Sequence, residues 1–78
     1  MSNASQKPNP GDQVMILPSD GLLGGNVATV RSLYASDNLS VMLFPGSPGT
    51  AGMLISPDTG MIHYLVSHGD WEFFKRGD

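Results

Sequence analysis

Chemistry in this chain would have to come from a short stretch near its C-terminus, where histidines and carboxylates cluster. His63, His68, Asp70 and Glu72 are all possible metal ligands, and a histidine can also act as a pH-sensitive group. A metal site needs three or four ligands that converge on one point, and no spacing among these four places them on one face. The sequence therefore predicts no metal site. We expect His63 to lie at the polar edge of a packed or interfacial patch.

Other catalytic groups are not recognisable in the sequence. The chain has no cysteine, which excludes a thiol nucleophile, a disulfide and a thiolate metal site. No serine lies in a nucleophile-elbow motif. Five aspartates occupy positions where turns favour this residue, namely Asp12, Asp20, Asp37, Asp58 and Asp70. We therefore expect no catalytic residue and no cofactor, and the sequence leans against an enzyme.

Two glycine-rich loops, 21–25 and 46–49, do not match a phosphate-binding loop, which needs a following Lys-Ser/Thr and a helix. Leu22 and Leu23 are unusual in such a loop, and they either fold back on the core or form an exposed contact. The full set of candidate ligand or interface residues is Leu22, Leu23, Met61, His63, Tyr64, Leu65 and Trp71.

Short apolar runs separated by turn residues must position these side chains. The expected strands are 13–17, 26–34, 39–44, 53–56 and 61–66, followed by a short strand or helical turn at 71–74. Pro57-Asp58-Thr59-Gly60 predicts a tight turn, so that 53–56 and 61–66 form a β-hairpin. The segment 45–52 is too rich in proline and glycine for a strand or helix. No window shows helical periodicity, so the pattern predicts an all-β barrel or sandwich.

The first residues of the expected domain resemble those of a known group of small barrels. Pro10-Gly11-Asp12-Gln13-Val14-Met15-Ile16, followed by Gly21, Gly24, Gly25, Val27 and Val30, resembles the start of KOW-type and other SH3-like barrels. The segments 58–66 and 69–70 are similar to the last hairpin of such barrels. The resemblance implies a five- or six-stranded SH3-like barrel over residues 9–76. It follows a tail, residues 1–8, that we expect to be disordered, and Ser2-Asn3-Ala4 has the sequence of a cloning remnant.

The chain has more apolar residues than one small barrel can bury. The expected core is Val14, Ile16, Val27, Val30, Leu33, Val41, Leu43, Ile55, Ile62, Tyr64 and Val66. The surplus is Met42, Phe44, Met53, Met61, Leu65, Leu22 and Leu23. Only 14% of residues are charged, against about 25% in a typical domain. A sparsely charged surface indicates that a partner covers part of it.

These features predict a non-catalytic binding or assembly module that acts through protein–protein contacts. We expect it to associate with itself, as a dimer or tetramer, and with another protein. The N-terminus has no apolar signal core, and no apolar run reaches the roughly 20 residues of a membrane span. We therefore expect a cytoplasmic location and no membrane partner.

Two alternatives stay open. The layout also resembles the plasmid-borne type II dihydrofolate reductases, whose pore motif is Val-Gln-Ile-Tyr. Met61-Ile62-His63-Tyr64 stands in that place and shares only the tyrosine, which would put Tyr64 and His63 at an oligomer pore. The second alternative is a KOW-like nucleic-acid module that uses Arg31, Lys75 and Arg76, and the net charge of −3 argues against that partner.

Overall fold

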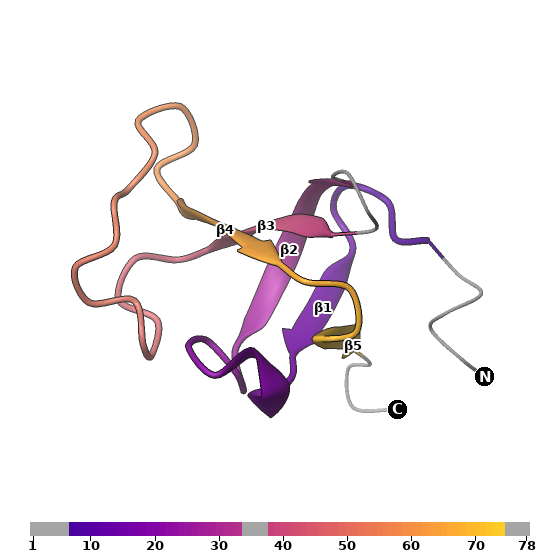
Figure 1. The fold of residues 1–78 in the computed structure, drawn as a ribbon. Helices are drawn as coiled ribbons and strands as arrows, with labels where there is room; N and C mark the ends of the chain where they lie inside the picture. The colour runs from indigo at the N-terminus through magenta and orange to yellow at the C-terminus, as the bar shows by residue number, and fades with distance from the viewer. Residues whose placement is uncertain (1–6, 34–37, 75–78) are drawn as a thin grey trace.

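The computed structural model describes residues 7–33 and 38–74 and shows one antiparallel β-sheet (Figure 1). Its strands are β1 (Gln13–Ile16), β2 (Val27–Leu33), β3 (Leu39–Leu43), β4 (Ile62–Val66) and β5 (Trp71–Phe73). A short 3₁₀ turn, η2 (Pro18–Asp20), follows β1. The strand order is β4-β3-β2-β1-β5. The prediction of an all-β fold is confirmed.

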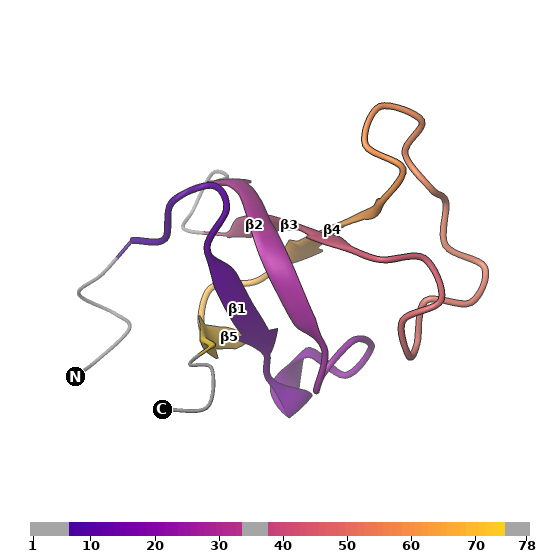
Figure 2. The ribbon, with the colours of Figure 1, turned by 180° about the vertical axis from the view of Figure 1, so that it is seen from behind.

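The sheet curls but does not close, because β4 and β5 form its two edges and do not pair with each other. Figure 2 shows β1 and β2 lying across one side, with β4 and β5 on the other. The predicted tail, residues 1–8, falls largely outside the described residues, and so does the segment 35–38, whose residue types favour a turn between the expected strands 26–34 and 39–44. Pro8, which is described, is buried.

The predicted hairpin is only partly present. Its turn forms as expected, since the Gly60 N–H donates to the Ser56 carbonyl at 2.8 Å and the Ser56 N–H donates to the Met61 carbonyl at 2.8 Å. The prediction of a strand over 53–56 is wrong. Only a single bridge pairs Ile55 with Ile62, because the chain leaves the sheet after β3 and returns to it just before β4.

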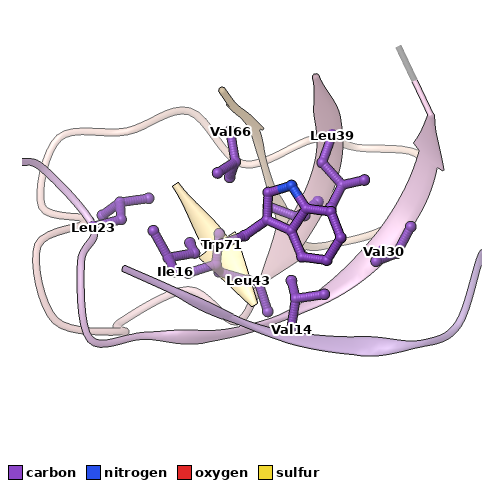
Figure 3. Close-up of a cluster of buried hydrophobic side chains, with 10 residues drawn as sticks. Val14, Ile16, Leu23, Val30, Leu39, Leu43, Val66 and Trp71 are labelled. Atoms are coloured by element: carbon purple, nitrogen blue, oxygen red, sulfur yellow. The ribbon is translucent and has the colours of Figure 1, made fainter. Parts of the chain in front are cut away.

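The core lies inside the curl of the sheet (Figure 3). Seven of the expected core residues are buried, namely Val14, Ile16, Val30, Val41, Leu43, Ile62 and Val66. Tyr64 packs against them from a half-buried position. Leu23, Ala28, Leu39 and Trp71 complete the buried apolar set. Core faces on β1, β3 and β4 follow the alternation of a half-buried strand.

Three expected core residues are exposed, and those predictions are wrong. Val27 and Val30 are three positions apart and so point to opposite faces of β2. Ala28 takes the interior position next to Val30 instead. Leu33 lies beyond a register shift between Val30 and Ser32, at the exposed end of β2. Ile55 leaves the core because its segment is not part of the sheet.

Trp71 on β5 lies among the buried side chains of the core (Figure 3) and meets Phe73 edge to face, with ring centroids 5.3 Å apart. This is the role expected of a terminal aromatic in a small barrel. Its indole Nε1 is buried and has no hydrogen-bond partner among the described residues.

Candidate functional site

The connection between β3 and β4 projects from the sheet as an arm, residues 44–61 (Figure 1). Its base is a series of three linked turns. The Ser47 N–H donates to the Phe44 carbonyl, the Thr50 N–H to the Ser47 carbonyl, and the Met53 N–H to the Thr50 carbonyl, at 3.0–3.1 Å. The central residues are Pro45-Gly46, Pro48-Gly49 and Ala51-Gly52, and the glycine has a positive φ in each turn. Glycine at that position is what type II turns require.

The arm is attached to the loop that follows η2. The Asn26 side-chain amide donates to the Pro48 carbonyl at 2.8 Å and to the Leu23 carbonyl at 3.1 Å. At Gly49 a Cβ would lie 2.9 Å from the Leu22 carbonyl oxygen, so only glycine allows this approach. Thr50 is buried and donates its hydroxyl to the Ser47 carbonyl. The base of the arm is therefore held against the rest of the fold.

The arm presents apolar side chains to solvent, at Phe44 in its base and at Leu54 and Ile55 further along it. Leu54 is 90% exposed, Phe44 73% and Ile55 52%. Exposed apolar side chains that form a patch typically mark a contact site, and these three come from the same arm. Because the turns and the Asn26 bond hold the base, the arm displays these side chains in a defined position.

A hollow of about 250 Å³ lies on β3 and β4 and is open to solvent. It is lined by Ser40, His63, Tyr64 and Leu65. Ser40 and Leu65 are cross-strand partners, as are Met42 and His63. His63 Nε2 lies 2.8 Å from Thr59 Oγ1, which also accepts the Met61 N–H at 3.2 Å. We call this surface the β3–β4 hollow.

Tyr64 is held by a polar contact on its other side. Its hydroxyl donates to both carboxylate oxygens of Asp20, at 2.9 and 3.1 Å. The N–H groups of Leu22 and Leu23 donate to Asp20 Oδ1 at 3.1 and 2.9 Å. Burial opposes ionisation of Asp20, but these donors outweigh it and lower its pKa. Burial first, and then the Asp20 contact, raise the pKa of Tyr64 to about 12. The pair is a structural link between η2 and β4.

The predicted site residues separate into groups. His63, Tyr64 and Leu65 meet at the β3–β4 hollow, and half-buried Met61 lies at the end of the arm. Leu22 is exposed. Leu23 and Trp71 are buried in the core, so neither offers a surface. Arg31 is exposed on β2, whereas Lys75 and Arg76 lie outside the described residues.

Leu54 was not among the predicted site residues. The sequence placed it only within the expected strand 53–56. A signal was present in the sequence. The segment 45–52 repeats a Pro-Gly or Ala-Gly pair every three residues, which indicates a chain of turns leading away from a strand.

Charges are unevenly distributed along the chain. From Asn38 to Gly69 the only charged residue is Asp58, if histidines are neutral. All four basic residues and the other six acidic residues lie outside this stretch. The stretch contains β3, the arm and β4. The arm and the β3–β4 hollow therefore share one nearly uncharged region.

Within residues 7–33 and 38–74, no three His, Asp or Glu side chains come close enough together to hold a metal ion. In the same ranges, none of the helical segments has the length and apolar character needed to cross a membrane.

Comparison with known proteins adds no family to this description. The chain matches no protein-family model, and no curated protein or solved structure is significantly similar to it.

Proposed function

We propose that this chain is a non-catalytic binding or assembly module that acts through protein–protein contacts, including contacts with copies of itself. The observation that carries the proposal is the position of the exposed apolar side chains. Phe44, Leu54, Ile55 and Leu65 all lie in the nearly uncharged stretch. The centres of protein interfaces are depleted of charge and enriched in such side chains.

The fold supports this proposal by supplying a platform. One curled sheet in the order β4-β3-β2-β1-β5 is compatible with the SH3-like barrel that the sequence resembles. Fold likeness alone does not define function, so the argument rests on the arm and the hollow. The absence of cysteine is in keeping with a reducing, cytoplasmic location, which we include in the proposal.

The pore-type ligand site has less support. Tyr64 and His63 are adjacent on β4, and successive strand residues point to opposite faces. The Tyr64 hydroxyl is also occupied by Asp20. A nucleic-acid site has less support as well, because the chain has only four basic residues against seven acidic ones.

The test is the solution mass of the protein by light scattering across a dilution series at low and at high salt. We expect a mass above that of the 8.3 kDa chain, falling on dilution and hardly weakened by salt. The reason is that apolar contacts, unlike ion pairs, are not screened. A single-chain mass at every concentration would rule out self-association, and a salt-sensitive oligomer would rule out this surface as its basis.

A further inference from the structure

We propose that the arm and the β3–β4 hollow are the two halves of one reciprocal contact, in which the arm of each copy lies on the hollow of a second copy. This inference rests on the proposed function. It adds the identity of the partner and the two surfaces that meet. The side chain that binds in the hollow is Leu54 of the other copy, together with its neighbour Ile55.

The arm does not fill the hollow of its own chain. Its base is held by the three turns and by the bond from Asn26 to the Pro48 carbonyl. Its return to the sheet is held by the bridge between Ile55 and Ile62, the first residue of β4. Figures 1 and 2 agree that the arm extends away from the sheet. Leu54 stays 90% exposed there, while the hollow on β3 and β4 stays open.

Charge favours a second copy over a charged partner. Neither surface carries a charged residue except Asp58 in the turn at the far end of the arm. Burying apolar side chains against a charged partner would leave that partner's charges desolvated and unpaired. A second copy presents an equally uncharged surface.

A pair of copies is the smallest assembly that uses both surfaces of every chain. Each chain has one arm and one hollow, so a two-fold contact uses both surfaces of both copies and leaves neither free. A head-to-tail arrangement needs three or more copies to close into a ring, and otherwise leaves one arm and one hollow unused at its two ends and continues to grow. The inference therefore favours a dimer over the tetramer that the sequence also allowed.

The test uses opposite charges on the two surfaces. Leu54→Lys changes the arm and Leu65→Glu changes the hollow. Leu33→Glu is the matched control, since Leu33 and Leu65 are both 47% exposed and Leu33 lies on β2 outside the uncharged stretch. Each substitution replaces a solvent-accessible side chain, and the circular dichroism of each variant verifies that it is folded.

We expect Leu54→Lys and Leu65→Glu each to weaken the dimer at least tenfold, roughly the effect of burying one unpaired charge. The Leu33→Glu control should stay within about threefold of wild type. An equimolar mixture of the two charged variants should recover the dimer. In the mixed pair, one contact has both original leucines and the other brings the introduced ammonium against the introduced carboxylate.

Any of the following results would contradict the proposed contact between arm and hollow. If the wild type is oligomeric but neither charged variant weakens it, this contact is wrong and the proposed self-association stands. If both variants are weak but their mixture does not recover, the arm does not meet the hollow. A wild type that is monomeric throughout removes this contact and self-association together. If that monomer also sediments with phosphatidylcholine vesicles, the surface faces lipid.

Discussion

The hydroxyl of Tyr64 donates to both oxygens of the Asp20 carboxylate, joining two residues that are 44 positions apart. The same carboxylate accepts the N–H groups of Leu22 and Leu23. One acidic side chain therefore shapes the loop after η2 and attaches it to β4. The contact orders the side of β4 that faces away from His63 and Leu65, which line the β3–β4 hollow.

Removing the Tyr64 hydroxyl should weaken this link while keeping the ring in place. Tyr64→Phe should lower the free energy of unfolding by about 1 kcal/mol, since a hydrogen bond to a partly exposed carboxylate is lost. Urea denaturation of both proteins would measure the difference. Unchanged stability would show that water replaces the hydroxyl at no cost.

The same contact predicts a dependence on alkaline pH. The pKa of Tyr64 is raised from 10.0 to about 12, by burial and then by Asp20 and the charge of Asp70. The folded state therefore favours the neutral phenol. Its contribution to stability is complete below pH 10 and is lost as the pH rises through about 12. The stability gap between wild type and Tyr64→Phe should narrow over this range, and a constant gap would contradict the assignment.

Gly49 should be the least replaceable glycine of the arm. Its φ is +83°, and an added Cβ would lie 2.9 Å from the Leu22 carbonyl oxygen and 3.1 Å from Leu23 Cδ2. Gly49→Ala should cost about 2–3 kcal/mol, from strain at positive φ and from displacement of the loop. Gly46 has φ +91° with nothing within 4 Å of its Cβ position, so Gly46→Ala should cost about 1 kcal/mol. Thermal unfolding compares the two, and equal losses would mean that the arm does not rest on this loop.

Two adjacent leucines should respond very differently to truncation. Leu23 is fully buried and Leu22 is 55% exposed. Leu23→Ala should cost about 2–5 kcal/mol through lost burial and a cavity. Leu22→Ala should change stability by less than about 0.5 kcal/mol. Chemical denaturation of both variants is the measurement. A large loss at Leu22 would mean that the loop packs differently.

Trp71 carries a buried donor without a partner among the described residues. Trp71→Phe removes that donor, which is worth about 1–3 kcal/mol, but it also removes apolar volume. The two effects oppose each other, so stability should change by less than about 1 kcal/mol. Trp71→Ala should instead cost about 3–5 kcal/mol. Equal losses for both variants, measured in denaturant, would show that the indole N–H is satisfied after all.

Local signals in the sequence were enough for much of the architecture. Turn residues separate short apolar runs, and alternation assigns the core faces of β1 and β4 correctly. Val14 with Ile16, and Ile62 with Val66, are buried as expected. These predictions succeed because a strand places every second residue on one face, whatever its partner is.

The sequence by itself thus determined an all-β chain with its charges concentrated outside residues 38–69. The tertiary structure decided which of Leu22 and Leu23 is buried, that Asp20 meets Tyr64, and that the arm projects instead of pairing over 53–56. The reason is physical. Strand propensity and turn type depend on neighbouring residues, whereas loop packing and pairing depend on the curvature of the whole sheet and on contacts between distant positions. Apolar residues such as Leu54 and Ile55 therefore predict a strand from their sequence, whereas in the fold their side chains are exposed to solvent.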